Sequence, residues 1–80
     1  MFYVYILKSQ KDGRHYYGYC EILCDRLKNH NTGKVRSTKS IRPFTIHYFE
    51  TFISKSEAIK REIFFKSVDG HRWLKANKII

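Results

Sequence analysis

The sequence predicts a small α/β fold, in which helices flank a three-stranded antiparallel sheet and the elements follow the order β-β-α-β-α-α. Runs rich in aromatic and β-branched residues alternate with segments of helical spacing, and the turn signal Asp12-Gly13 joins the first two runs as a hairpin. The 80 residues have room for one core and show neither a linker nor an internal repeat. We therefore expect a single domain over residues 1–80.

The strands are predicted from composition and turn signals. Residues 2–8 and 14–20 form the predicted hairpin, and residues 45–52 form the third strand. The segment 33–43 is polar and basic, has no period and ends at the only proline, so we expect a loop there.

Three helices are predicted from spacing and capping residues. Residues 22–30 have helical spacing, and Gly33 is suitably placed as a C-terminal cap. Ser54 followed by Glu57 forms a capping box at the start of a helix over 54–67. A last short helix is expected from near Asp69-Gly70.

The chain carries a large excess of positive charge. It has 16 Lys and Arg against 7 Asp and Glu, a net charge of +9, spread from Lys8 to Lys78. Such a charge repels itself and is most easily tolerated when the partner is a polyanion. Nucleic acid is therefore the expected partner, and a basic protein that is merely soluble is the alternative that composition leaves open.

Cysteine content and hydropathy bound the environment. Cys20 and Cys24 are too few for a zinc site without histidine ligands at a suitable spacing, and we expect free thiols in a reducing compartment. No run approaches the roughly 20 apolar residues of a membrane span, and the first residues lack the features of a secretory signal. We expect a cytoplasmic protein with no membrane partner.

Three polar side chains fall inside the apolar stripes of predicted helices. At ~100° per residue, Arg26 and His30 lie in the apolar arc of the first helix and Glu62 lies in that of the second. A buried unpaired charge costs several kcal/mol, so these groups must pair or bind something. One interpretation is a structural Arg26–Glu62 bridge; the other is a site in which Arg26 holds a phosphate and Glu62 holds a hard divalent metal ion. Both interpretations predict that the two helices meet.

The hairpin is lined with tyrosines. With an even-numbered loop, Tyr5, Tyr16, Gly18 and Cys20 share one face of the sheet. Gly18 then leaves a gap beside Tyr16, of the kind at which a ligand or another backbone comes close. A phenol beside such a gap could transfer a proton, whereas core or surface packing is the alternative for any single tyrosine.

Taken in order, these residues resemble the GIY-YIG nuclease domain, and most of all its short stand-alone members. The likeness runs over residues 2 to about 67 and rests on the following set: Tyr3-Val4-Tyr5, Tyr16-Tyr17-Gly18, Arg26, His30 and Lys60-Arg61-Glu62. The tripeptides depart from the family pattern, since Tyr3 stands where the first glycine would be, but both key tyrosines are present.

The resemblance implies a metal-dependent endonuclease that hydrolyses phosphodiester bonds, with DNA favoured over RNA and a place in DNA repair or recombination. It implies that Tyr5 and Tyr16 are the active-site phenols, that Arg26 contacts the scissile phosphate and that His30 assists nearby. It further implies that Glu62 ligates one Mg²⁺ or Mn²⁺ ion.

The mechanism expected from these roles uses a phenol as a base. A phenol is a poor base unless nearby positive charge lowers its pKa, and Arg26, His30, Lys66 and a metal ion on Glu62 are candidates for that effect. The hypothesis is that Tyr5 or its hydrogen-bonded neighbour accepts the proton of the attacking water. Which tyrosine is the base stays open at this point.

Basic residues supply the expected nucleic-acid surface. These side chains would contact the sugar-phosphate backbone without reading bases: Lys34, Arg36, Lys39, Arg42 and Lys66. A solvated basic loop is the alternative for the first four. Nothing resembles a base-reading helix, so targeting by a protein partner stays open. Two rival functions also stay open: a non-catalytic nucleic-acid-binding module with the tyrosines as stacking platforms, and a protein-interaction domain.

Overall fold

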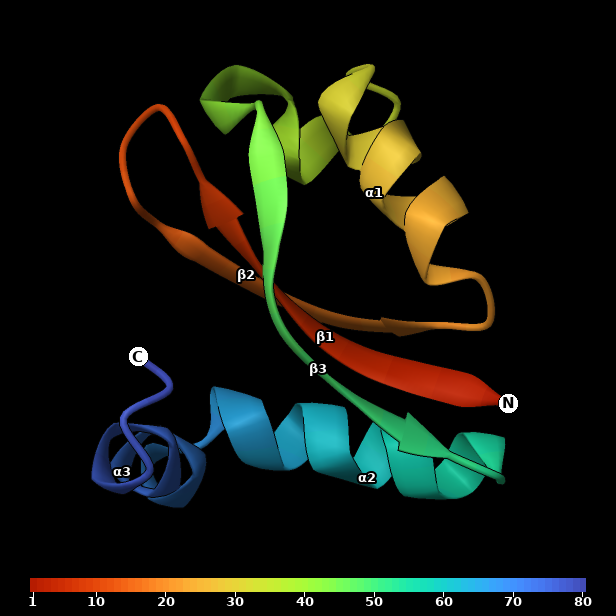
Figure 1. Ribbon diagram of the computed structural model, residues 1–80, viewed down its shortest axis with the longest axis vertical. Coiled ribbons are helices and arrows are strands. Elements are labelled where there is room, and N and C mark those ends of the chain that lie inside the picture. Colours follow the sequence, from red (N-terminus) through yellow and green to blue (C-terminus); the bar gives the residue numbers. More distant parts are fainter.

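The computed structural model describes residues 1–80 and has the predicted order of elements (Figure 1). Their bounds are β1 (Phe2–Ser9), β2 (His15–Cys20), α1 (Leu23–Asn31), the 3₁₀ helix η1 (Arg36–Ile41), β3 (Phe44–Phe52), α2 (Lys55–Lys66) and α3 (Val68–Ala76). The three strands form one antiparallel sheet in the order β2-β1-β3. The α/β prediction is confirmed, and the segment 33–43, expected to be a loop, contains η1.

The register of the hairpin decides which side chains share a face. Tyr5 pairs with Gly18 and Leu7 pairs with Tyr16, and the turn between the strands uses Gly13 at a φ of 78°. The parity prediction is therefore confirmed, because Tyr5, Tyr16, Gly18 and Cys20 lie on one face of the sheet.

The sheet separates two apolar clusters. Figure 1 shows α1 and η1 on one side of the sheet, with α2 and α3 on the other. The central strand β1 contributes Val4 and Ile6 to the cluster under α2 and α3, and Tyr5 and Leu7 to the cluster under α1. All four side chains are fully buried, as expected for a central strand that is covered on both faces.

The prediction that the first two long helices meet is wrong. Because α1 and α2 lie on opposite faces of the sheet, the Arg26–Glu62 bridge does not form, and Arg61 is the arginine of α2 that has a carboxylate partner, Glu50. The inward side of α2 is set by Ala58 and Phe65, whereas Ile63 is 63% exposed.

Capping residues fix the helix ends. The Ser54 hydroxyl accepts from the backbone N–H of Glu57 at 3.2 Å, so half of the predicted capping box is present. Ser67 caps α3 in the same way through Gly70 at 3.0 Å, which starts that helix at Val68, slightly earlier than expected. Gly33 follows the C-cap of α1 at a φ of 81°, as predicted.

Each helix is too short and too polar to cross a bilayer.

Candidate active site

Four of the predicted site residues gather between the sheet and α1. The Arg26 Nε–H donates to the Tyr5 hydroxyl at 3.1 Å, and the same hydroxyl lies 3.3 Å from His30 Nε2. The Tyr16 and His30 rings are in tilted contact, with an interplanar angle of 59° and centroids 4.8 Å apart. Arg26 and His30 reach the two tyrosines because they are one turn apart on the face of α1 that covers the hairpin.

The hydrogen bonds of this cluster have a defined direction. A guanidinium only donates, so the Tyr5 oxygen accepts from Arg26 and its own proton is donated to His30 Nε2. The other ring nitrogen, Nδ1, then carries the imidazole hydrogen and donates to Thr38 Oγ1 at 2.8 Å. The Thr38 hydroxyl in turn donates to the Val35 carbonyl at 3.4 Å.

Burial keeps Tyr5 and His30, two members of this hydrogen-bonded cluster, neutral. It raises the pKa of Tyr5 to about 12, even though the hydrogen bond and charge of Arg26 act in the opposite direction. It also lowers the pKa of His30 to about 4, with a further contribution from the Arg26 charge. The expected lowering of a phenol pKa by positive charge is therefore wrong for Tyr5, because removal from water outweighs its neighbour.

Arg26 has hydrogen-bond donors that no other residue of the protein uses. Its side chain is half-buried and makes no ion pair, and its Nη groups have no hydrogen-bond partner. A planar guanidinium in this state can donate two parallel hydrogen bonds to the oxygens of one phosphate.

The absence of a side chain at Gly18 makes room for the Tyr5 phenol. A Cβ at this position would lie 2.6 Å from Tyr5 Cζ, closer than any real contact. The gap predicted beside Tyr16 is thus filled by the Tyr5 phenol from the neighbouring strand, and not by a ligand.

Glu62 and Lys66 lie outside this cluster. Both belong to α2, which covers the other face of the sheet, and no hydrogen bond or ion pair joins Glu62 to the Arg26 cluster. The Glu62 side chain is 15% exposed, and its one charged neighbour is Lys66 Nζ at 3.8 Å. Lys66 is 55% exposed, so this pair is worth little.

The donor chemistry of Glu62 is compatible with a divalent ion. Its carboxylate oxygens accept no hydrogen bond, and no group of three His, Cys, Asp or Glu side chains is arranged to hold a metal. Mg²⁺ is commonly held by one or two carboxylates, with water and substrate phosphate oxygens completing its shell. A single hard oxygen donor of this kind fits an ion whose remaining ligands come from water and substrate.

The predicted basic residues Lys34, Arg36, Lys39 and Arg42 are all exposed. They lie in or beside η1, which packs next to α1, so they are on the same side of the sheet as Arg26.

Sequence reasoning missed Thr38, which holds the imidazole of His30. Thr38 is only 1% exposed and lies within η1. Its surroundings, Arg-Ser-Thr-Lys-Ser, are uniformly polar, so nothing in the sequence distinguishes the one hydroxyl that turns inward.

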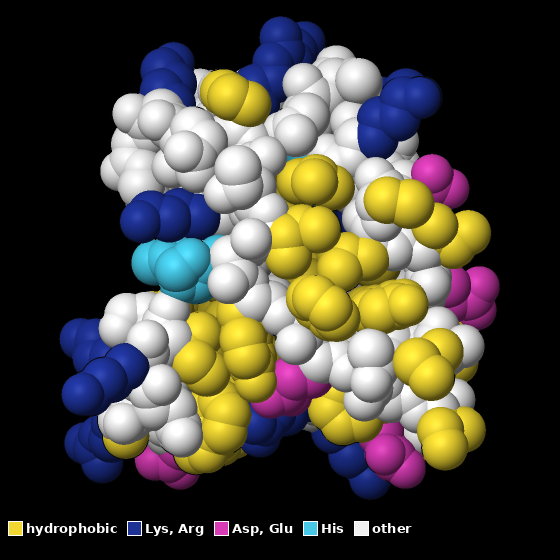
Figure 2. Space-filling model, in the orientation of Figure 1, with side chains coloured by type: hydrophobic (Ala, Val, Ile, Leu, Met, Phe, Trp, Pro, Cys, Tyr) yellow, Lys and Arg dark blue, Asp and Glu magenta, His cyan; other side chains and the backbone are white.

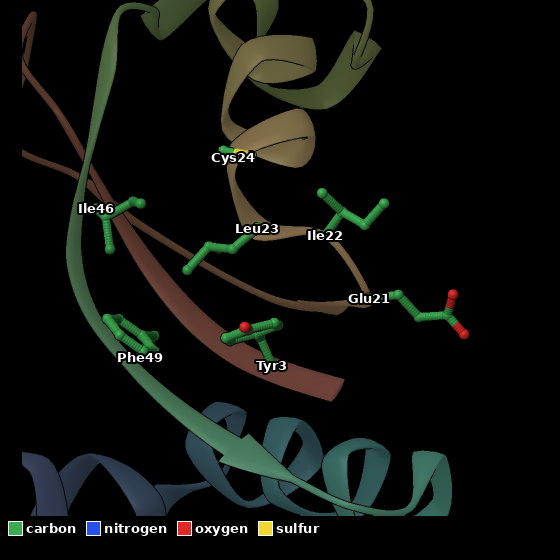
Figure 3. A pocket seen from close by; sticks show the side chains of 7 residues that line it. All are labelled: Tyr3, Glu21, Ile22, Leu23, Cys24, Ile46 and Phe49. Carbon is green, nitrogen blue, oxygen red and sulfur yellow. The ribbon is translucent and has the colours of Figure 1, made fainter. Parts of the chain in front are cut away.

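An apolar hollow of about 490 Å³ lies on the same face, at the start of α1. Figure 3 shows Tyr3, Leu23, Ile46 and Phe49 directed toward a common space between α1, β1 and β3. None of its lining residues belongs to the Arg26 cluster, and its apolar lining does not suit a phosphate.

The fold agrees with the family that sequence comparison identifies. Residues 1–76 match the GIY-YIG catalytic domain, and the chain belongs to this family of nuclease domains. The predicted resemblance is thereby confirmed, and family membership points to a nuclease that acts on nucleic acid.

The similar proteins are short members of this family. The chain is 42% identical to a UPF0213 protein of Staphylococcus saprophyticus over 74 residues, which cover 91% of this chain and 89% of the relative. It is 43% identical to a UPF0213 protein of Staphylococcus haemolyticus, with the same coverage of both. The solution NMR structure of a UPF0213 protein of Bacillus halodurans superposes with a TM-score of 0.57 at 35% identity, covering 98% of this chain and 86% of that one.

Proposed function

We propose that the protein is a metal-dependent endonuclease that hydrolyses phosphodiester bonds in nucleic acid, with DNA favoured as substrate. The observation that supports this proposal best is the state of Arg26. Its guanidinium is half-buried, faces a neutral phenol instead of a carboxylate and keeps its Nη groups available. Positive charge without an internal counterion suits the binding of a scissile phosphate.

Arg26 would bind the nonbridging oxygens of that phosphate and stabilise the charge that develops on them during attack. Tyr5 orients the guanidinium by accepting its Nε–H, and His30 orients Tyr5 by accepting the phenol proton. Because both are buried and neutral, we assign them as positioning residues for Arg26.

Tyr16 is the better candidate for the base. Tyr5 is fully buried, and its oxygen already accepts one hydrogen bond and donates another. Tyr16 is half-buried beside His30 and makes no side-chain hydrogen bond, so its oxygen is free to meet water. In the proposed step Tyr16 reacts as its phenolate. The water oxygen forms a bond to phosphorus while one water proton passes to the phenolate oxygen, and the bond from phosphorus to the 3′ oxygen breaks, so that the 3′ oxygen leaves as an alkoxide and takes a proton from solvent.

Glu62 would hold one Mg²⁺ or Mn²⁺ ion, which when bound supplies Lewis-acid stabilisation of negative charge on substrate oxygens. Because α2 covers the face opposite Arg26, this ion would meet the substrate at a point separate from the guanidinium. The basic residues around η1 would contact the sugar-phosphate backbone on the α1 side, and Lys66 would do so near Glu62.

Conversion of supercoiled plasmid to nicked and linear forms tests the proposal, in Mg²⁺, Mn²⁺ or EDTA. We expect metal-dependent cutting that is lost in Tyr16→Phe and retained in Tyr17→Phe, because Tyr17 is the next residue of β2 and faces the other side of the sheet. Likewise, Glu62→Gln should lose activity and Glu57→Gln, on the exposed part of the same helix, should keep it.

Two outcomes would count against the proposal. Equal cutting by all five proteins would indicate a contaminating nuclease. No cutting of plasmid, branched or single-stranded substrates, with salt-sensitive and metal-independent binding intact, would instead support a non-catalytic binding module.

A further inference from the structure

A cluster of histidines lies on the face of the sheet opposite the Arg26 site. The rings of His15 on β2 and His47 on β3 are 5.1 Å apart between centroids, although β1 lies between their strands. They meet above Lys8, which is the cross-strand partner of His15. His47 is the residue that the pairing of β3 with β1 skips, and its ring is held by the Ile79 carbonyl.

Helix α3 adds a third histidine and a lysine. The His71 ring lies 5.8 Å from that of Tyr17, two residues beyond His15 on the same face of β2. Lys75 is one helical turn after His71 and therefore shares its side of α3. We call Lys8, His15, His47, His71 and Lys75 the histidine patch.

No Asp or Glu side chain forms an ion pair with the histidine patch. The pKa of His15 is lowered first by burial and then by His47, Lys8 and His71, and no acidic group acts on it. Asp12, at the hairpin tip, is already paired with Arg14 at 2.9 Å, and Asp69 is two residues before His71 and therefore on a different face of α3. In Figure 2 the histidines appear at the left of the view, with Lys and Arg side chains above and below them.

The histidine patch borders the same open strand edge as the proposed active site. β2 is an edge strand, and its consecutive residues His15 and Tyr16 face opposite sides of the sheet. A polyanion that runs along this edge would meet the histidine patch from one face and Arg26 from the other. In Figure 1 the two faces are stacked along the longest axis of the molecule, whose Cα extent is 28 Å, and the β2 edge lies between them.

We infer that the histidine patch is a second contact surface for the sugar-phosphate backbone of nucleic acid, and that it binds more tightly as its histidines become protonated. This inference depends on the proposed function in one respect, the identification of the ligand as nucleic acid. A phosphate oxygen accepts hydrogen bonds from imidazolium and ammonium groups, and it supplies the negative charge that the patch lacks.

The sign of the pH dependence follows from linkage. A bound anion favours the charged form of each imidazole, so the complex takes up protons relative to the free protein and affinity rises as pH falls. His30 does not contribute near pH 6, because it is buried and its pKa is about 4. The chain has 4 histidines, and the other three belong to the patch.

Binding measured in EDTA tests the inference independently of cleavage. The fluorescence anisotropy of a labelled oligonucleotide would be followed between about pH 8 and about pH 6, for the wild type and for a variant with His15→Gln, His47→Gln and His71→Gln. We expect the wild type to gain roughly three- to tenfold more affinity over this range than the variant. Lys55→Gln, on the exposed start of α2, is the control for loss of one positive charge elsewhere and should keep the wild-type pH dependence.

Equal pH dependence in the wild type and a folded triple variant would overturn the inference. If the triple variant does not fold, NMR titration of the wild-type imidazoles replaces it, and histidine pKa values unmoved by the oligonucleotide would overturn the inference equally. A response to inorganic phosphate as large as that to the oligonucleotide would overturn the assignment to a polymeric ligand. If the wild type did not cleave nucleic acid but its affinity for the oligonucleotide still rose as pH fell, the result would count against the proposed function alone.

Discussion

The two faces of the sheet each hold a half-buried arginine next to a tyrosine, and the two arginines differ in their partners. On the α2 face, Arg61 donates to both oxygens of Glu50 at 2.8 and 3.1 Å, and its guanidinium lies 4.3 Å from the centroid of the Trp73 ring. Tyr48 completes this group by donating to Glu50 at 2.6 Å. On the α1 face, Arg26 donates only to Tyr5 and has no carboxylate.

The difference separates an arginine with a structural role, Arg61, from Arg26, for which we propose a functional role. The charge of Arg61 is neutralised by a carboxylate and its guanidinium is covered by an aromatic ring. Its interactions therefore stabilise the folded protein. The charge of Arg26 is not neutralised, and folding leaves its Nη donors for a ligand. Both tyrosines have a pKa raised to about 12, Tyr5 through burial and Tyr48 through burial and its bond to Glu50, so the tyrosine alone does not distinguish the two faces.

Removing each arginine in turn is the strongest test of this contrast. Arg26→Gln should reduce cleavage by about 10²- to 10³-fold, as expected for loss of a group that stabilises transition-state charge. Its free energy of unfolding should change by less than about 1 kcal/mol, because only one bond to a neutral phenol is lost. Arg61→Gln should instead destabilise the protein by about 2 kcal/mol, because it leaves Glu50 without its partner. Plasmid cleavage and urea denaturation distinguish the two, and the contrast fails if Arg61→Gln reduces cleavage by folded protein as much as Arg26→Gln does.

The two faces should also lose stability in different pH ranges. The pKa of His30 is lowered from 6.5 to about 4 in the folded state, so its stabilising contribution is complete above about pH 6.5 and is lost as pH falls toward 4, by up to about 3 kcal/mol. For Glu50, burial raises the pKa, but the bonds from Arg61 and Tyr48 hold it below its usual range, so the loss on that face comes at lower pH.

Urea denaturation at a series of pH values, with His30→Gln and Glu50→Gln beside the wild type, checks this expectation. The difference between the wild type and His30→Gln should shrink between about pH 6.5 and 4, because the other histidines are common to both proteins. A difference that stays constant over this range would show that His30 is protonated in the folded protein.

A methyl group at Gly18 should disturb the α1 face alone. Gly18→Ala places a Cβ against the Tyr5 phenol, and we expect a destabilisation of about 1–3 kcal/mol together with reduced cleavage. Gly13→Ala is the control, because its Cβ would meet nothing within 4 Å and the φ of 78° makes the strain purely local. Cleavage by folded Gly13→Ala should match the wild type, and reduced cleavage in both variants would remove the link to Tyr5.

The smallest expected effect is at Thr38. Thr38→Val keeps the shape of the side chain but leaves His30 Nδ1–H without an acceptor, which should destabilise the protein by about 1–2 kcal/mol. Thr38→Ser keeps the hydroxyl and should restore the pH dependence of stability assigned to His30. If valine and serine give the same pH profile, the hydroxyl does not hold the imidazole.

The fold could be predicted from the sequence where local signals determine structure. Asp12-Gly13 fixes the hairpin, Ser54 and Gly33 mark helix ends, and the period of two in the strands places Tyr5 and Tyr16 on one face. These signals act over a few residues and do not depend on the rest of the chain.

The relative placement of the helices could not be predicted in this way. Helical periodicity shows that Glu62 faces inward, but it does not show which face of the sheet α2 covers, and the chain crosses to the other face after β3. Burial has the same non-local origin. Positive charge near Tyr5 was expected to lower its pKa, but that strand is covered on both sides and desolvation decides the direction.

The position of Thr38 would link the proposed substrate contact to the geometry of the site. Its hydroxyl supports His30 from the middle of η1, whose flanks carry the exposed Arg36 and Lys39. A sugar-phosphate backbone that shifted these basic side chains would therefore also shift Thr38, which binds the His30 imidazole. Through His30 it would shift Tyr5 and Arg26. The η1 segment that would contact the substrate also supports the hydrogen bonds that orient the Arg26 guanidinium, so a change in the substrate contact would change the orientation of Arg26.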